Sequence, residues 1–425
     1  MVIVLFTFSN CPAFGEEAAP AFDAITVDAA ITPAVAKYII KSIEESSSAR
    51  SQGLIILLDT PGGLDLAMRD IIKEILNSPL PVILFVHPSG ARAASAGVMI
   101  TMAAHVAAMT PGTNIGAAHP VAMGVGGKMD ETMAKKIEND AVAYAVGIAN
   151  KKGRNAEWVE DAVRKSVSIT AEEALELNVI DIVAENMSAL LDKLDGKTIT
   201  LPSGDVSLKS KGARINEKTM GFRERILTTL SDPNIAYLLL MIGLAGLYFE
   251  FAHPGAILPG VVGGISLILS FFAMQTLPVN YAGILLIIFG IILFIAEIKI
   301  VSHGMLTVAG VICLVLGSLM LFESPIPALR VSLRVMIPTI IIISLFFVAV
   351  ISIAVKAQLR KPATGIEGMI GIKGKTITGV HEGGKVFIRG EVWNASSDDT
   401  IEEDQLVKVT GVKGLNLKVE KTEDQ

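Results

Sequence analysis

Ser95 is the side chain of this sequence best placed to act as a nucleophile. It lies in Ser89–Gly97 (SGARAASAG), where its neighbours are nearly all small and an apolar helix is expected to begin. Free N–H groups and the dipole at a helix N-terminus favour negative charge that develops on such a hydroxyl. A serine at this position can also serve only as a helix cap, and Ser89 in the preceding loop is a competing candidate.

An oxyanion formed by such a serine would need N–H donors, and a pair of glycines could supply them. Gly62 and Gly63 end the segment Asp59–Gly63 (DTPGG), which directly follows the aliphatic run Gly53–Leu58. Because glycine has no Cβ, its amide can approach a ligand closely, and backbone amides stabilise an oxyanion. On its own the motif favours a simpler interpretation, a tight turn between a strand and a helix.

A serine nucleophile needs a base, and the long helix expected over Glu131–Lys151 carries two adjacent lysines. Its apolar stripe consists of Met133, Ile137, Ala141, Tyr144 and Ile148. Lys136 falls about 100° from the centre of this stripe, whereas Lys135 falls about 160° away and faces solvent. Only Lys136 can therefore bring its amine to a partly buried site, where burial favours the neutral form that a base requires.

His119 is a second candidate base. It follows Ser95 along the chain, in Gly116–Pro120 (GAAHP), and histidine is the commonest general base in proteins. A Ser–His site usually contains a carboxylate that orients the imidazole, and the sequence does not place one. The identity of the base therefore stays open between Lys136 and His119.

The elements that must position these residues alternate between short strands and longer helices. The unbroken aliphatic runs are typical of strands whose two faces are both covered. We expect strands at Asp23–Val27, Gly53–Asp59, Pro81–Val86 and His105–Met109, and helices at Pro33–Ser48, Leu66–Asn77, Ala94–Ala104 and Glu131–Lys151. This alternation predicts an α/β domain with a mostly parallel sheet over residues 22–214.

Residues 235–357 concentrate the apolar side chains of a chain that is 51% apolar overall. Five segments of about 17–22 residues each match a hydrocarbon core of ~30 Å at ~1.5 Å per residue. They are Ile235–Phe251, Ile257–Leu277, Tyr281–Ile298, Met305–Phe322 and Val335–Val355. Glycines such as Gly243, Gly246 and Gly263 allow membrane helices to approach closely. We therefore predict an α-helical membrane bundle of about five spans in a lipid bilayer.

An odd number of spans places the domains before and after the bundle on opposite sides of the membrane. Lys356, Arg360 and Lys361 directly follow the last span and favour the cytoplasm for the C-terminus. The α/β domain would then lie outside the cytoplasm. The apolar run Met1–Phe8, followed by small residues, agrees with this orientation because it is typical of a secretory signal peptide over residues 1–15.

Short β-runs with frequent glycines fill the C-terminal residues 363–425. Strands are expected at Gly371–Lys375, Gly384–Arg389, Gly390–Ala395, Gln405–Val412 and Asn416–Glu420, which predicts a small all-β barrel of the OB type. The net charge of −6 offers no basic footprint for nucleic acid. In the barrel segment no aromatic-basic pattern stands out, since Phe387 and Trp393 are its only aromatic residues. We therefore interpret the barrel as a protein-interaction module, with nucleic-acid binding as the weaker alternative.

The cysteine content argues against thiol chemistry. The only two cysteines are Cys11, in the apolar N-terminal stretch, and Cys313, inside an expected span. The soluble parts therefore have no thiol for a disulfide or a cysteine-ligated metal. We expect neither a metal nor another cofactor.

Several of these motifs together resemble a known family. The Asp59–Gly63 turn, Ala94–Gly97 around the serine and Pro111–Gly116 (PGTNIG) look like the ClpP-class, crotonase-like serine peptidases. Gly153–Trp158 (GRNAEW) and Ser168–Ala174 (SITAEEA) match the long-form NfeD membrane proteins, and Thr364–Gly368 (TGIEG) and Gly390–Ala395 (GEVWNA) are similar to that family's OB-fold domain. The resemblance covers nearly the whole chain.

The resemblance implies a membrane-bound serine endopeptidase whose Ser–Lys dyad falls on Ser95 and Lys136. The amides of Gly62, Gly63 and Ala96 match the family's oxyanion-hole positions. Members are linked to stomatin-like membrane proteins, whose apolar segments are the implied substrates, and crotonase-like domains generally assemble into oligomers. Soluble ClpP peptidases use Ser-His-Asp, which keeps His119 as the alternative base. The competing hypothesis is a non-catalytic scaffold that organises a stomatin-like partner in the membrane.

Overall fold

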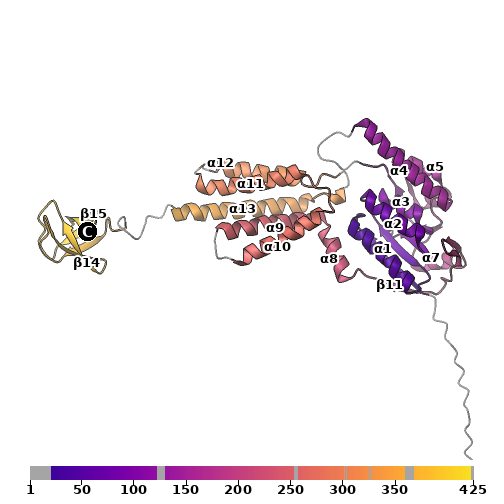
Figure 1. The fold of residues 1–425 in the computed structure, drawn as a ribbon, viewed down its shortest axis with the longest axis horizontal. Helices are drawn as coiled ribbons and strands as arrows, with labels where there is room; N and C mark the ends of the chain where they lie inside the picture. The colour runs from indigo at the N-terminus through magenta and orange to yellow at the C-terminus, as the bar shows by residue number, and fades with distance from the viewer. Residues whose placement is uncertain are drawn as a thin grey trace, which may run out of the picture. The chain divides into compact units, whose positions relative to one another are not determined.

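The computed structural model describes residues 21–121, 130–252, 257–300, 302, 304–324, 327–358 and 368–422. The expected signal peptide, residues 1–15, therefore lies outside the described residues. The chain divides into two compact units. One holds the N-terminal α/β domain together with most of the apolar helices, and the other holds the C-terminal barrel (Figure 1).

Six parallel strands form the main sheet of the described N-terminal domain. Their order is β11-β1-β2-β3-β5-β8, and every neighbouring pair is parallel. The strands are β1 (Ala21–Asp28), β2 (Leu54–Asp59), β3 (Val82–Val86), β5 (Val106–Met109), β8 (Ile182–Val183) and β11 (Arg214–Glu217). The strands expected from the sequence are β1, β2, β3 and β5, and the mostly parallel sheet is confirmed.

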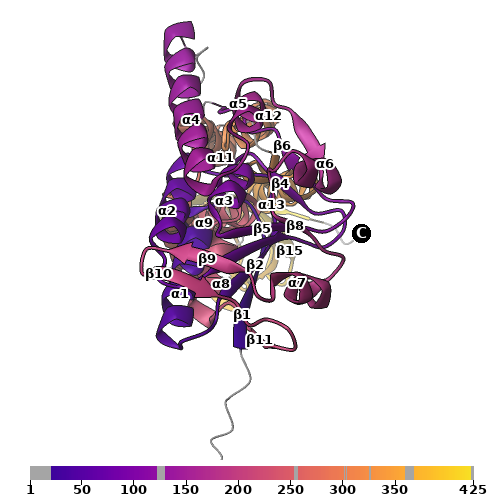
Figure 2. The same ribbon diagram turned by 90° about the vertical axis from the view of Figure 1, so that its right-hand side faces the viewer.

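Helices cover this sheet, which explains its unbroken aliphatic runs. Along β2, the side chains of Leu54, Ile56 and Leu58 join one apolar core, while Ile55 and Leu57 pack in a second core on the opposite face. The helices of the domain are α1 (Pro33–Ser48), α2 (Asp65–Asn77), α3 (Ala96–Ala103), α4 (Glu131–Lys152), α5 (Ala156–Arg164), α6 (Ala171–Glu176) and α7 (Met187–Leu194). Residues of α1 to α5 line the first core, and α7 with the hairpin β9 (Thr198–Leu201) and β10 (Gly204–Ser207) covers the second (Figure 2).

A second, smaller sheet was not expected from the sequence. It consists of β4 (Arg92–Ala94), β6 (Asn114–Gly116) and β7 (Ser168–Thr170), in that order. A parallel bridge between Thr60 and Ala93 connects its first strand to the end of β2. Strands of three residues carry too little periodicity to be recognised in a sequence, yet this sheet sets the chain direction immediately before Ser95.

Arg154 binds the C-terminal end of α3, the helix that begins after Ser95. Its buried guanidinium donates from Nη1 to the carbonyls of Thr101 and Ala104, each at 3.1 Å, and from Nη2 to the Asp181 carboxylate at 2.6 Å. Carbonyls in the last turn of a helix lack partners within the helix, and a cation at that end also suits the helix dipole. Arg154 therefore fixes the C-terminal end of α3 on the core of the domain.

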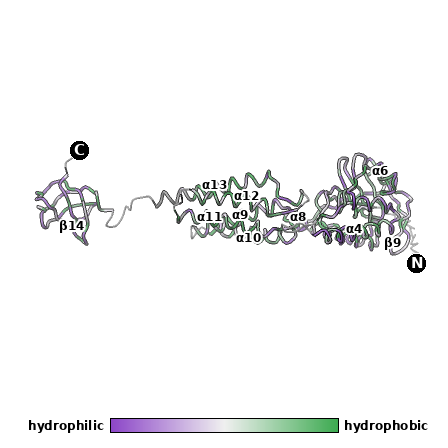
Figure 3. The backbone as a smooth tube through the Cα atoms, turned by 90° about the horizontal axis from the view of Figure 1, so that it is seen from above, coloured by the Kyte–Doolittle hydropathy of each residue, from purple (hydrophilic) through white to green (hydrophobic). Residues whose placement is uncertain are grey.

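Five apolar helices follow, at the positions predicted for the membrane bundle. They are α9 (Pro233–Ala252), α10 (Ile257–Met274), α11 (Tyr281–Lys299), α12 (Met305–Met320) and α13 (Leu333–Gln358). Among the described residues, Pro233–Phe251, Ile257–Met274 and Leu333–Val350 are long and apolar enough to cross a membrane, whereas Tyr281–Glu297 and Met305–Met320 are slightly shorter. Apolar residues dominate all five helices (Figure 3).

Glycines bring these helices together in pairs. A Cβ added to Gly263 of α10 would lie 2.8 Å from the Leu247 nitrogen and 3.0 Å from the Gly243 oxygen of α9. A Cβ added to Gly290 of α11 would likewise lie 2.8 Å from the Gly310 oxygen of α12. Backbone approaches backbone at these points, so α9/α10 and α11/α12 form two close helical hairpins within the bundle (Figure 1).

The C-terminal residues form a closed five-stranded barrel within the described range 368–422. The strand order is β12-β13-β14-β16-β15, closed between β15 and β12. The strands are β12 (Lys373–Thr376), β13 (Gly384–Ile388), β14 (Glu391–Ser396), β15 (Leu406–Lys413) and β16 (Asn416–Lys421). Side chains such as Val386, Val407 and Leu417 fill its interior. The predicted small barrel is therefore confirmed, with each strand close to its expected position.

Replacement of Gly263 by alanine should destabilise the helical bundle by about 1–3 kcal/mol, because the new methyl group collides with the backbone of α9. The neighbouring Gly264 provides a matched control, since a Cβ there would meet nothing within 4 Å. Gly264→Ala should leave stability unchanged or raise it by up to about 1 kcal/mol. Thermal unfolding of the full chain in detergent tests this, and equal midpoints for the two variants would contradict the packing described above.

His105 should make the N-terminal domain sensitive to acid. Its Nδ1 accepts the Val82 N–H at 3.2 Å, and burial, with the nearby charges of Lys152 and Arg154, lowers the pKa of His105 from 6.5 to about 3. Because the pKa is lower in the folded chain, protons favour the unfolded chain, and stability is lost as the pH falls from about 6.5 towards 3, by up to about 1.4 kcal/mol per pH unit.

His105→Asn keeps an acceptor for the Val82 amide but cannot titrate. Unfolding midpoints measured between pH 7 and pH 5 should therefore fall less in this variant than in the unmodified chain. If the unfolding midpoints of the two proteins fall by equal amounts, His105 does not control the loss of stability between pH 7 and pH 5.

Candidate active site

Ser95 occupies the single residue between a strand and a helix. Strand β4 ends at Ala94 and α3 begins at Ala96, and Ser95 has φ 53° and ψ −113°, a conformation that non-glycine residues rarely adopt. Its amide donates to the Gly116 carbonyl at 3.1 Å. Within the described residues its side chain makes no capping hydrogen bond, so Ser95 is not an ordinary helix cap and its hydroxyl is available.

Ser89, the competing serine, is placed differently. Its hydroxyl donates to the Pro111 carbonyl. It is exposed and is not among the residues that line the cavity beside Ser95. The geometry therefore favours Ser95 over Ser89 as the nucleophile.

The glycine pair after β2 lies directly against Ser95. Gly62 has φ +108°, and a Cβ added to it would lie 2.6 Å from Ser95 Cβ and 3.0 Å from Ser95 Oγ. A Cβ on Gly63 would lie 2.2 Å from the Ile31 oxygen. Neither position can hold a larger residue without displacing its neighbours, so the DTPGG segment is more than a tight turn.

The two glycine amides have different surroundings. The Gly62 amide donates to Thr60 Oγ1 at 3.2 Å, and Thr60 is fully buried. In the bridge between Gly63 and Ile31, the Ile31 amide donates to the Gly62 carbonyl and the Leu64 amide donates to the Ile31 carbonyl, each at 2.8 Å. The Gly63 amide is therefore directed away from Ile31. The Ala96 amide, the first of α3, likewise lacks a partner within its helix. Both Gly63 and Ala96 line the cavity that contains Ser95, whereas Gly62 does not.

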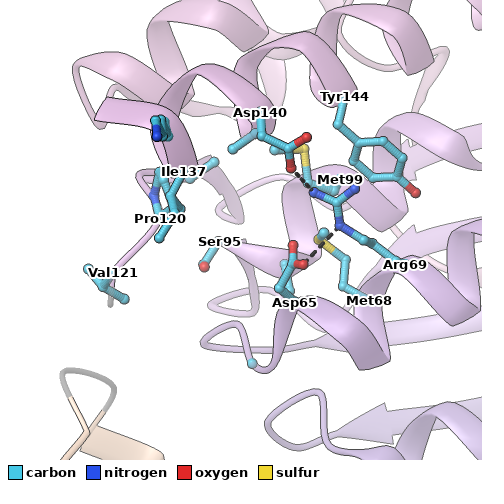
Figure 4. Close-up of a pocket in the computed structure, with 15 residues that line it drawn as sticks. Asp65, Met68, Arg69, Ser95, Met99, Pro120, Val121, Ile137, Asp140 and Tyr144 are labelled. Carbon is cyan, nitrogen blue, oxygen red and sulfur yellow. Dashed lines mark hydrogen bonds and ion pairs between the residues drawn. The ribbon is translucent and has the colours of Figure 1, made fainter. Parts of the chain in front are cut away.

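This cavity has a volume of about 550 Å³ and brings together residues from several elements. Ser95 lies at its centre, between Pro120 and Val121 on one side and Met68 and Met99 on the other (Figure 4). Lys136 of α4 also lines it, but Lys135 does not. Of the two lysines compared in the sequence, Lys136 is therefore the one that borders the cavity.

The burial predicted for Lys136 is not found in the single chain. The apolar stripe of α4 is buried at Ile148 and partly buried at Tyr144, but Met133 is 52% exposed and Ile137 is 38% exposed. Lys136 is exposed as well. The prediction was wrong for the first half of α4 because this half extends beyond the body of the domain (Figure 2). Among the described residues, no hydrogen bond joins Lys136 to Ser95.

His119 does not line the cavity beside Ser95. Its Nδ1 lies 2.9 Å from the Val163 carbonyl oxygen. Because a carbonyl can only accept, Nδ1 carries the hydrogen of this contact. This contact ties His119 to α5 rather than to Ser95.

Arg69 is a site residue that sequence reasoning missed. Its guanidinium lines the cavity, where Nε pairs with Asp65 at 2.8 Å and Nη2 pairs with Asp140 at 2.5 Å (Figure 4). It also lies 4.3 Å from the centre of the Tyr144 ring. The Asp65–Arg69 spacing is a signal readable from sequence, but the pairing with Asp140 is not. Through the Arg69–Asp140 ion pair, α2 binds α4 one helical turn after Lys136.

Replacement of Gly62 by alanine should abolish labelling of Ser95 by a fluorophosphonate, since the new methyl group would displace the serine. Gly90 is the matched control because it also has a positive φ of +91°, but a Cβ there would meet nothing within 4 Å. Both variants suffer the backbone cost of about 1–2 kcal/mol, and only Gly62→Ala should lose the label. Gel-based probe labelling measures this; similar labelling of both variants would contradict the role assigned to Gly62.

Comparison with protein families matches three parts of the chain. Residues 22–201 match the N-terminal domain of NfeD1b, residues 234–372 match the NfeD integral membrane domain, and residues 366–421 match the NfeD-like C-terminal, partner-binding domain. The three models follow one another in the order α/β domain, apolar helices and barrel. The protein is therefore an integral membrane protein.

Curated relatives match over nearly the full length. The chain is 37% identical over 387 residues to the membrane-bound protease PH1510 of Pyrococcus horikoshii, covering 88% of this chain and 87% of that protein. It is 27% identical over 420 residues to the membrane protein NfeD1b of Bacillus subtilis, covering 93% and 91%. A solved structure, a lysine-to-alanine mutant of the 1510-N membrane-bound stomatin-specific protease in complex with a substrate peptide, is 32% identical and covers 50% of this chain and 98% of that one, with a TM-score of 0.46. The chain belongs to the long-form NfeD family of membrane-bound serine proteases.

Proposed function

We propose that this protein is an endopeptidase that uses Ser95 as nucleophile and Lys136 as base to cleave apolar peptide segments. One observation carries the proposal: Ser95 and Lys136 line one cavity of about 550 Å³, whereas Lys135 and His119 do not. Met68, Met99 and Ile137 line the same cavity and suit an apolar peptide.

In this mechanism the neutral amine of Lys136 accepts the proton from Ser95 Oγ as the oxygen attacks the scissile carbonyl. The amides of Gly63 and Ala96 stabilise the oxyanion, because each lines the cavity and neither is used within its own element. Gly62 contributes by its lack of a Cβ, since its own amide is held by Thr60. Lys136 then returns the proton to the leaving amine, and water releases the acyl group from Ser95 in a second, equivalent cycle.

A second copy of the chain is proposed to complete this site. The first half of α4 presents Met133 and Ile137 to solvent beside Lys136. Burial of these apolar side chains in a homo-oligomer would also remove water from the amine, and this favours its neutral form. An assembly therefore supplies the desolvation that the single chain does not.

The partner is proposed to be a stomatin-like membrane protein. The motifs resemble a family linked to such proteins, and the matched model of the C-terminal barrel is described as partner-binding. With the spans between them, the peptidase domain would lie outside the cytoplasm and the barrel inside it, as the basic residues after the last span favour. The second candidate function, a non-catalytic scaffold for the same partner, is favoured by the apolar helices and this barrel, because proteolysis alone needs neither.

Ser95→Ala should reduce cleavage of an apolar fluorogenic peptide by the full chain to background, and Lys136→Ala should reduce kcat by at least ~100-fold, as expected for loss of a general base. Lys135→Ala is the matched control on the same helix and should retain activity. His119→Ala should also cleave, because its imidazole contacts α5.

The outcomes separate the hypotheses. Loss of activity in His119→Ala with retained activity in Lys136→Ala would overturn the Ser–Lys assignment. Unchanged turnover in Ser95→Ala would exclude Ser95 as the nucleophile. If the unmodified chain neither cleaves the peptide nor reacts with a fluorophosphonate, yet still binds a stomatin-like protein, the scaffold function is the correct one.

A further inference from the structure

Helix α8 (Phe222–Leu230) carries an exposed apolar face that the protease function does not use. Phe222 is 83% exposed and Ile226, one turn later, is 42% exposed. Residues four apart lie on the same side of a helix, so these two side chains form one patch. Contiguous apolar patches rimmed by polar residues mark surfaces that contact a protein or a membrane.

The opposite face of α8 is already occupied by the N-terminal domain. Glu224 accepts a hydrogen bond from Lys41 of α1 at 2.6 Å. Thr228, one turn after Glu224 on the same face, lines a cleft of about 450 Å³ together with Val35 of α1 and the segment before it. The rotation of α8 about its axis is therefore set, and Phe222 and Ile226 must point away from the domain.

The segment before α8 is also attached to the domain. Lys218 pairs with the buried carboxylate of Asp23 at 2.8 Å, and its carbonyl accepts a hydrogen bond from the Tyr38 hydroxyl at 3.1 Å. Burial by itself would raise the pKa of Asp23, but hydrogen bonds from Lys218, Ser46 and Asn216 outweigh it and the pKa is lowered. The carboxylate stays charged, so α8 moves with the N-terminal domain.

Two arginines flank the apolar face. On a helical wheel Arg223 lies about 100° from Phe222 on one side and Arg225 lies about 60° from it on the other. Both are exposed. An apolar face bordered by arginines is the pattern of a helix that lies in the interface of a membrane, with its cations among the lipid phosphates.

The membrane must be close to this helix. Only Ser231 and Asp232 separate α8 from α9, which begins at Pro233 and is long and apolar enough to cross the bilayer. Nine helical residues span about 14 Å, so no part of α8 can lie far from the point where α9 enters the bilayer. The polar headgroup layer on each side is about 5–8 Å thick.

We propose that α8 is an interfacial helix that binds the bilayer surface, with Phe222 and Ile226 inserted among the lipids and with Arg223 and Arg225 bound to anionic headgroups. The occupant of this face is therefore lipid, because the face is continuous with a membrane-spanning helix and its charge complements a phosphate layer. Since the other side of α8 is bound to α1, lipid binding fixes the height and tilt of the N-terminal domain above the bilayer. This inference does not depend on the identity of the catalytic base.

The test uses the full chain in liposomes, with Cys11 and Cys313 replaced by serine and one nitroxide label introduced at a time. The readout is the ratio of a label's accessibility to oxygen to its accessibility to a polar nickel complex. For labels at Phe222→Cys and Ile226→Cys this ratio should be several-fold higher than for a label at an exposed site of the same domain. Leu177, which is 43% exposed, is the matched control. The ratio at Leu177→Cys should be that of a label in water.

A second arm tests the charge. In liposomes that contain phosphatidylglycerol, Arg223→Gln together with Arg225→Gln should reduce the oxygen-to-nickel ratio at position 222. In pure phosphatidylcholine the same pair of substitutions should have a smaller effect, since no anionic headgroup is lost. An equal effect in the two lipids would show that Arg223 and Arg225 do not bind anionic headgroups.

Two results would overturn the lipid assignment. A label at position 222 that is as accessible to nickel as one at position 177 places α8 in water. A label shielded from both reagents, and freed when the protein is diluted into excess lipid, places a second copy of the chain on this face. A high oxygen-to-nickel ratio that is independent of protein concentration supports the interfacial helix.

Discussion

The contact between Gly62 and Ser95 is the constraint on which the site depends. The serine is held in a rarely populated backbone conformation between β4 and α3, and the space it needs exists only because Gly62 has no Cβ. Thr60 fixes the glycine through its hydroxyl and also bridges to β4. The same few residues thus present the candidate nucleophile and the glycine amides beside it.

The rest of the N-terminal domain holds this local geometry in place. The main sheet carries the DTPGG segment at the end of β2, and the small sheet β4-β6-β7 delivers the chain to Ser95. Arg154 binds the carbonyls at the C-terminal end of α3, so the helix that starts after Ser95 cannot shift along its axis without breaking those bonds. The cost of an unusual backbone at Ser95 is offset by many ordinary contacts elsewhere in the core.

Helix α4 and helix α8 show the opposite arrangement, since each exposes apolar side chains in the single chain. On α4, Met133 and Ile137 are exposed beside the cavity, and on α8 the exposed pair is Phe222 and Ile226. Their surroundings differ: α4 projects from the domain on the side of the cavity, while α8 leads directly into the first spanning helix. We therefore assign different partners to them, another copy of the chain for α4 and the lipid surface for α8.

The architecture could be predicted from the amino-acid sequence alone, as could a set of candidate site residues. Buried strands such as β2, the five apolar helices and the strands of the barrel have strong periodicity or length, so they could be predicted from the residues alone. Motif and helical phase also singled out Ser95, the glycine pair and Lys136 as candidates, although the partial burial expected of Lys136 is not found in the single chain. Features that depend on contacts between distant segments could be found only in the folded structure. The three-residue strands of the small sheet, the engagement of the Gly62 amide by Thr60, the Arg69–Asp140 ion pair and the exposure of Lys136 are of this kind, because residues far apart in the chain meet there and leave no periodic signal.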